Sequence, residues 1–223
     1  MRITFLLALT LASTSIATVT QAQEFQVFNQ QVAQGPSIQD LLQPRNQLSD
    51  ILGRSELDRQ ISRGEQAMEA EDYEEAERLF RDVLQKSPPN RHEIHTKLGE
   101  AILHQVTNQV TSPLPWLQNR AQRSTGDAIS EFNSALELEP DYFSALAGLY
   151  KSYEHRGDFF RNRQNPDLDQ AIEDYRQAND YLDAASQSFT NQNGRINFRL
   201  EGTDKNRITR KLNNALLRRA FMR

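Results

Sequence analysis

The chain has 223 residues, of which 37% are hydrophobic and 25% charged, and its formal net charge at pH 7 is −4. Its 9 glycines and 8 prolines are too few for a collagen-like or low-complexity chain, and its lack of cysteine excludes disulfides, thiolate metal sites and cysteine nucleophiles. The acidic balance argues against a nucleic-acid-binding protein. We therefore expect a folded protein with a thin core and no nucleic acid as partner.

Residues 1–22 have the pattern of a secretory signal peptide. Arg2 is followed by an apolar run at 3–12, and small and polar residues then lead to Ala22. The run is about 10 residues long, whereas a membrane-spanning helix needs ~18 or more, so cleavage after Ala22 is favoured over a membrane anchor. We expect an exported bacterial protein, periplasmic or secreted, and not a lipoprotein because the chain has no cysteine.

Residues 23–55 are polar and rich in glutamine, with prolines at 36 and 44. Two short apolar patterns, at 37–42 and 48–52, are each compatible with a short helix. The sequence therefore predicts a polar N-terminal arm, partly ordered, ahead of the first repeat.

One spacing then recurs: an alanine, an aromatic residue four positions later, a small or β-branched residue three later, and a proline five later. Its copies are Ala76, Phe80, Val83 and Pro88; Ala128, Phe132, Ala135 and Pro140; and, without the proline, Ala171, Tyr175 and Ala178. The steps of four and three place these residues on one face of a helix, and the proline ends that helix. The pattern predicts three amphipathic helices.

A second helical pattern precedes each copy. The small residues Gly64 and Gly99 let two helices approach closely, while the aromatic residues fill the space between helix pairs. A turn is expected at Gly157-Asp158, before the third copy. Asn165, which precedes a proline, is expected to cap the helix that follows.

These features resemble the tetratricopeptide repeat (TPR) family over roughly residues 57–187. The matching positions are Gly64, Tyr73, Ala76, Phe80 and Pro88; Leu98, Gly99, Ala128, Phe132, Ala135 and Pro140; Leu149, Tyr153, Gly157, Ala171, Tyr175 and Ala178. The resemblance implies an all-α fold, a right-handed stack of three helix pairs at about 57–90, 91–142 and 143–187, within an array at 56–190. In this family the first helices of the pairs line a concave groove, which usually holds a peptide or another protein.

Two insertions depart from the family pattern. The interval from the first-helix small residue to the second-helix alanine is 12 residues in the first copy, and it is longer by 17 residues after Gly99 and by 9 after Tyr150. We expect the insertions to lengthen helices or to form loops at one edge of the stack. The family's first-helix tryptophan is absent.

The C-terminal part is predicted to be a polar linker at 191–202 and a helix at 203–223, with Thr203 as its N-cap. Its basic surface consists of Arg207, Arg210, Lys211, Arg218 and Arg219. A helix with one apolar face and one polar, solvent-exposed face is suited to cap the end of an open stack. The alternative is that this cationic amphipathic helix lies on an anionic membrane or envelope polymer.

The groove is the binding site that the resemblance implies. By helical position, its lining is Asp58, Ser62, Glu65, Met68, Glu69, Glu93, Thr96, Lys97, Glu100, His104, Lys151, Glu154 and His155. This mainly acidic lining favours a partner segment of basic or mixed charge, with Glu65, Lys97, Glu100 and Lys151 as the main polar contacts. The alternative is that the chain's own arm or basic helix fills the groove.

Trp116, the single tryptophan, lies in the first insertion beside two prolines. An exposed tryptophan there is a candidate anchor for a partner, because tryptophan is enriched at interface hot spots. The alternative is that it packs against the next helix.

Nothing in the sequence argues for catalysis. His92 and His95 are three residues apart, whereas the zinc-protease motif needs four, and the carboxylates at 69–77 lie at a helix end and turn. We expect no catalytic residue, metal or cofactor.

The sequence favours a non-enzymatic scaffold or adaptor that binds an envelope protein. The alternatives are an anionic-surface binder and an accessory subunit whose active site forms only in a complex. The oligomeric state stays open.

Overall fold

The computed structural model describes residues 38–107, 115–193 and 199–222. The predicted signal peptide and the first part of the predicted arm lie outside these residues. The chain divides into two units, Met1–Arg54 and Ser55–Arg223, and the second contains all the repeat-like segments.

All regular elements among the described residues are helices. They are α2 (Ile38–Glu69), α3 (Tyr73–Gln85), α4 (Arg91–Thr107), α5 (Pro115–Leu138), α6 (Phe143–Asn162), α7 (Leu168–Asn193), the short π-helix η1 (Arg199–Asp204) and α8 (Lys205–Phe221). The all-α prediction is confirmed for these residues. None of these helices is both long enough and apolar enough to span a bilayer.

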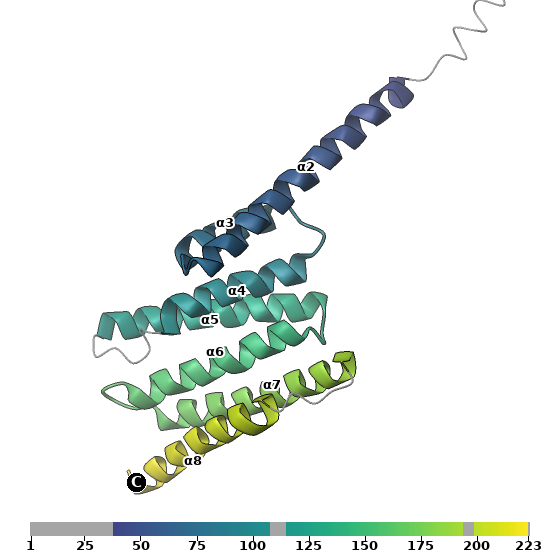
Figure 1. Cartoon of the computed structure of the whole chain (residues 1–223). Helices are drawn as coiled ribbons and strands as arrows, with labels where there is room; N and C mark the ends of the chain where they lie inside the picture. The colour runs from purple at the N-terminus through teal and green to yellow at the C-terminus, as the bar shows by residue number, and fades with distance from the viewer. Residues whose placement is uncertain (1–37, 108–114, 194–198, 223) are drawn as a thin grey trace, which may run out of the picture. The chain divides into compact units, whose positions relative to one another are not determined.

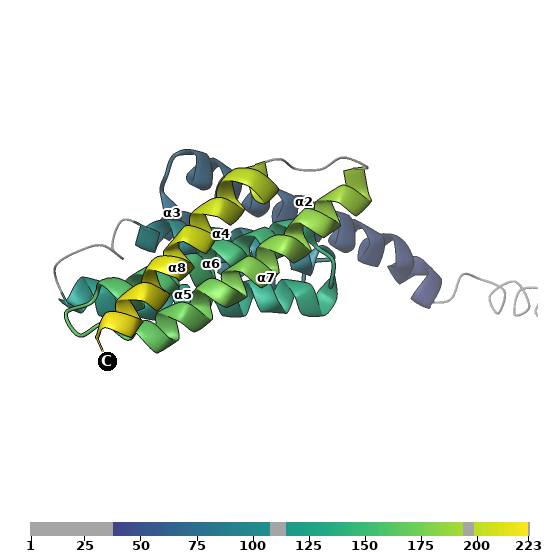
Figure 2. The ribbon, with the colours of Figure 1, turned by 90° about the horizontal axis from the view of Figure 1, so that it is seen from below.

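The helices of the second unit pack mainly on their neighbours in the chain. Contacts join α3 to α4, α4 to α5, α5 to α6, α6 to α7 and α7 to α8, and Figure 1 shows these helices following one another in that order. Seen from below, α8 lies along α7 at the end of the series (Figure 2). The core is therefore a continuous band of side chains between successive helices.

The aromatic rings of this core pack directly against glycines of the neighbouring helices. A Cβ atom at Gly64 would lie 2.6 Å from Cε1 of Phe80, and one at Gly99 would lie 2.8 Å from Cε1 of Phe132. Both separations are too short for a side chain, so α2 and α4 can approach their partner helices only because these positions are glycine. The prediction that small residues allow close helix approach is confirmed. The aromatic residues were expected between helix pairs, but Phe80 lies against the first helix of its own pair, and Phe132 lies between Gly99 of its own pair and Gly148 of the next.

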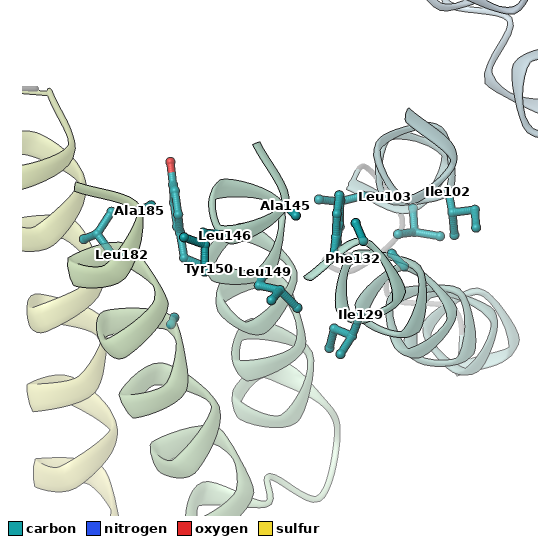
Figure 3. Packing of buried hydrophobic residues seen from close by; sticks show 14 of the residues in the cluster. Ile102, Leu103, Ile129, Phe132, Ala145, Leu146, Leu149, Tyr150, Leu182 and Ala185 are labelled. Carbon is teal, nitrogen blue, oxygen red and sulfur yellow. The ribbon is translucent and has the colours of Figure 1, made fainter. Parts of the chain in front are cut away.

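The alanines, the aromatic residues and the single valine of the recurrent spacing are fully buried. They are Ala76, Phe80, Val83, Ala128, Phe132, Ala135, Ala171, Tyr175 and Ala178. Figure 3 shows how the core continues across α6: Leu146, Leu149 and Tyr150 lie between Phe132 of α5 and Leu182 of α7. Burying each large side chain contributes roughly 1.5–3 kcal/mol, so the spacing marks the residues that hold the helices together.

The third pair corrects the expected turn. Gly157 and Asp158 lie inside α6, which continues to Asn162, and Gly157 contacts the ring of Tyr175. The ring therefore rests on α6 two turns beyond Tyr150. A glycine next to an aspartate is a common turn signal, but here close packing requires the glycine.

Helix ends differ from the predictions in two further places. α2 begins at Ile38, so part of the predicted arm is the start of a long helix that continues into the first repeat. α7 runs to Asn193, into the predicted linker. Of the two expected outcomes for the insertions, longer helices are observed for most of their length, because α5 begins at Pro115 and α6 and α7 are both extended.

Two predicted caps are wrong for the same reason: a nearby aspartate takes the position. Asp167 Oδ1 accepts from the backbone N–H of Gln170 at 3.1 Å, so Asp167 rather than Asn165 caps α7. Asp204 rather than Thr203 precedes α8, and its carboxylate bonds to side chains instead of to the helix backbone.

Candidate functional site

The predicted groove residues lie on α2, α4 and α6, and five of them form a central charge cluster: Glu65, Lys97, Glu100, His104 and Lys151. The Lys97 Nζ atom donates to Glu65 Oε1 at 2.6 Å, which joins α4 to α2. Both side chains are about one-third to one-half exposed, so this ion pair contributes no more than about 1 kcal/mol. Its main effect is to fix the Lys97 ammonium group beside Glu100.

Glu100 is the least satisfied charge of the cluster. Its side chain is half-buried on α4, and burial raises the pKa of its carboxyl although Lys151 and Lys97 act in the opposite direction. Among the described residues it has no hydrogen bond and no ion pair within 4 Å. A half-buried carboxylate of this kind gains from any cation that reaches it, because the cation offsets part of its desolvation.

Aromatic rings border the cluster. The imidazole of His104 stacks on Tyr73 with 4.9 Å between ring centroids, and burial, assisted by Lys151, lowers the pKa of His104 against the opposing charge of Glu71. Tyr142 lies edge-on to His92, also at 4.9 Å, and burial raises its pKa. The cluster therefore combines charges of both signs with flat apolar surfaces.

Two predicted groove residues are not available to a partner. Thr96 is 3% exposed, and its hydroxyl donates to the His92 carbonyl of its own helix at 2.9 Å. Glu154 is 6% exposed and is held by Arg207 and Lys211 of α8. The prediction is wrong for both: Thr96 faces the core, and α8 covers Glu154.

The ion pairs of α8 correct the predicted basic surface. Arg207 donates to both Glu154 oxygens at 2.8 Å, and Lys211 contacts Glu154 and Asp158. The pKa of Glu154 is lowered, because these two cations outweigh the opposing effect of its burial. Three of the five predicted basic residues form ion pairs with α6 or α7, since Arg219 also pairs with Asp169 of α7 at 2.7 Å.

The other two predicted basic residues form no ion pair among the described residues. Arg218 donates to the Arg161 carbonyl at 3.2 Å, while Arg210 is exposed and has no ion pair among the described residues. These contacts favour the interpretation of α8 as a closing helix. They also bear on the alternative that the chain's own basic helix fills the groove, because α8 covers the part of the predicted lining that lies on α6.

The remaining predicted positions are spread over the surface. Asp58, Ser62 and Glu69 are exposed on α2, and no described contact joins them to the central charge cluster. Met68 packs partly against the core. Glu93 is half-buried beside His92.

His155 is half-buried next to the α8 ion pairs, and burial lowers its pKa. Trp116 is 62% exposed at the start of α5. Packing of Trp116 against the next helix is therefore wrong, and its role as an anchor stays a prediction.

The histidine pair has a structural contact. His95 Nδ1 lies 2.8 Å from Glu131 Oε2 of α5, and no group of three potential metal ligands occurs in the described part of the chain.

A cleft of about 590 Å³ lies between α5, α6 and α7, away from the predicted groove residues. Its lining is Asn119, Gln122, Arg123, Gly126, Arg156, Phe160 and Gln170. Sequence reasoning missed it because the lining comes from three helices and no sequence spacing links them. The available signal was the pair of insertions, because all seven residues fall in the two intervals that the insertions lengthen.

Comparisons of the chain with protein-family models, with curated proteins and with solved structures give no match.

Proposed function

We propose that the chain is an exported, non-enzymatic scaffold or adaptor of the TPR type, which binds a segment of an envelope protein on the face formed by α2, α4 and α6. Two features support a TPR-like stack. The buried alanines and aromatics recur at the family's spacing, and each helix packs mainly on its chain neighbours. Rigid helices present fixed side chains, so little ordering entropy is lost on binding.

Glu100 is the single observation that carries the proposal. It is a half-buried carboxylate with a raised pKa and no hydrogen bond among the described residues. Such a group is costly in the free protein and useful in a complex, because an incoming Lys or Arg side chain satisfies it. Lys151 is exposed nearby and has no ion pair among the described residues. The partner is therefore a segment of mixed charge, with a cation for Glu100 and an acidic group for Lys151.

The test is position-specific photo-crosslinking in an envelope extract, with the full-length exported chain carrying the crosslinker in place of His104, which is exposed in the cluster. The control crosslinker replaces Arg176, which is exposed on α7. We expect one dominant adduct from position 104 only. Glu100→Lys should abolish the adduct because it reverses the charge that receives the partner's cation. Glu137→Lys, the same change at an exposed site on α5, should leave it intact. Equal adducts from both positions, or an adduct insensitive to Glu100→Lys, would refute the proposal.

A second candidate function is binding to an anionic surface through α8. Its specific support is an exposed apolar end, where Leu217, Phe221 and Met222 are 58%, 88% and 62% exposed. Because Arg207, Lys211 and Arg219 are engaged with α6 and α7, few cations remain for lipid headgroups, so this candidate ranks second. Sedimentation with anionic vesicles that is lost in a Leu217→Ser/Phe221→Ser double variant would favour it.

A further inference from the structure

We propose that the cleft between α5, α6 and α7 is a second binding site, which takes a polar ligand bearing an oxyanion, either a carboxylate or a phosphate, with Arg123 and Arg156 as the groups that contact the anion. The inference is independent of the proposed function, because none of the cleft residues belongs to the central charge cluster.

Arg156 is held in place by a buried partner. Its Nε and Nη2 atoms donate to the two oxygens of Asp174 at 3.0 and 2.8 Å, and the Asp174 side chain is 1% exposed. Gln170 adds a third hydrogen bond to Asp174 at 3.1 Å. Arg156 itself is 25% exposed, and its Nη1 atom donates to nothing among the described residues. The guanidinium group is thus preorganised with N–H donors left over, and Arg156 lines the cleft.

Arg123 supplies the uncompensated charge. It lines the cleft from α5 and has no ion pair or hydrogen bond among the described residues. Asp174 neutralises one of the two guanidinium groups, so the lining keeps one net positive charge. Asn119, Gln122 and Gln170 add amide groups that donate and accept hydrogen bonds. This is a donor-rich set that suits an anion carried on a polar body.

Gly126 keeps the cleft open. A glycine inside a helix weakens it relative to alanine, and at Gly64, Gly99, Gly148 and Gly157 a close aromatic ring explains the choice. At Gly126 an added Cβ atom would meet nothing within 4 Å, so packing does not require glycine there. Gly126 lines the cleft, and we attribute its missing side chain to the space a ligand needs.

The size and origin of the cleft agree with a dedicated site. Ligand pockets are typically about 300–1,000 Å³, and this one is about 590 Å³. All seven lining residues fall in the intervals between Gly99 and Ala128 and between Tyr150 and Ala171. These intervals are longer than the corresponding one of the first copy by 17 and 9 residues, so the cleft lies where the second and third helix pairs are extended.

The test is an NMR titration of the ¹⁵N-labelled chain with citrate and, separately, with inorganic phosphate, each to about 10 mM, where a millimolar site saturates. The reporters are the backbone amide of Gly126 and the side-chain Nε–Hε groups of Arg123 and Arg156. We expect saturable shifts of these signals with at least one anion. The anion that binds more tightly identifies the ligand as a carboxylate or a phosphate.

Variants distinguish the cleft from general charge attraction. Arg123→Gln should weaken binding at least tenfold. Gly126→Leu should abolish it by filling the cleft, without lowering the melting temperature. Arg120→Gln is the matched control: it removes a cation one turn away on α5, whose one ion pair among the described residues is with exposed Glu74 at 3.5 Å, and it should bind normally. The absence of a saturable shift with both anions, or equal weakening in Arg120→Gln and Arg123→Gln, would overturn the proposal. Arg123→Gln keeps the test decisive if Gly126→Leu does not fold.

Discussion

The ring of Phe132 lies between two glycines, Gly99 on α4 and Gly148 on α6, and a Cβ atom at Gly148 would overlap the ring. Gly148→Ala should therefore destabilise the protein by about 1–3 kcal/mol, the usual cost of overpacking a core. Gly126→Ala makes the same chemical change where the helix has open space, and it should stabilise by up to about 1 kcal/mol through helix propensity. Urea denaturation of both variants checks this, and a matching loss of stability in both would contradict the assignment of Gly126 to open space.

Glu100 gives a pH-dependent prediction. Because burial raises its pKa in the folded protein despite Lys97 and Lys151, the folded state binds this proton more readily than the unfolded state does. The contribution of Glu100 to the free energy of unfolding is fully present below the unfolded glutamate pKa of about 4.3. It is lost as the pH rises through the pKa of Glu100 in the folded protein. Glu100→Gln should thus be more stable than the natural protein at pH 7, by up to about 1 kcal/mol, and equally stable near pH 3.5. Denaturation at both pH values measures the gap, and a gap independent of pH would exclude the buried-carboxylate explanation.

At the scale of the helix, the sequence predicts the parts of each helix that pack but not where the helices end. The alanine–aromatic spacing identifies the buried faces of α3, α5 and α7 because one stripe of contacts decides both sequence and packing. Helix ends depend on weaker preferences that several residues can satisfy. Asn165 and Asp167 are both good caps, and only the three-dimensional path of the chain decides for Asp167.

The candidate site, too, could be predicted from the sequence only in part. Helical position alone predicts that Glu65, Lys97, Glu100 and Lys151 line one face of adjacent helices. The hydrogen bond between Lys97 and Glu65 and the electrostatic effect of both lysines on the Glu100 pKa agree with this prediction. The fate of Glu154 could not be predicted this way. Its partner Arg207 is 53 residues away, and nothing in either local pattern indicates that α8 would cover α6.

At the scale of the molecule, packing between chain neighbours means that damage at one end should stay local. Stability in such an arrangement comes mostly from contacts between adjacent elements. α8 meets the rest of the chain through α7, η1 and the ion pairs with α6, whereas α4 and α5 pack on each other and on their own neighbours. The α8 end can therefore open without the α4–α5 core.

Glu154→Ala tests this. The change removes the carboxylate that Arg207 and Lys211 share, and breaking a buried pair of this kind costs on the order of 3 kcal/mol. Hydrogen exchange followed by mass spectrometry should show lost protection in α8 and η1, with α4 and α5 unchanged. Glu173→Ala removes an exposed ion pair with Arg176 and an exposed hydrogen bond from Gln177, both within α7, and should change protection by less than about 1 kcal/mol. Uniform loss across all helices in Glu154→Ala would mean that the molecule unfolds as one cooperative unit, and α8 would then be part of its core rather than a closing helix.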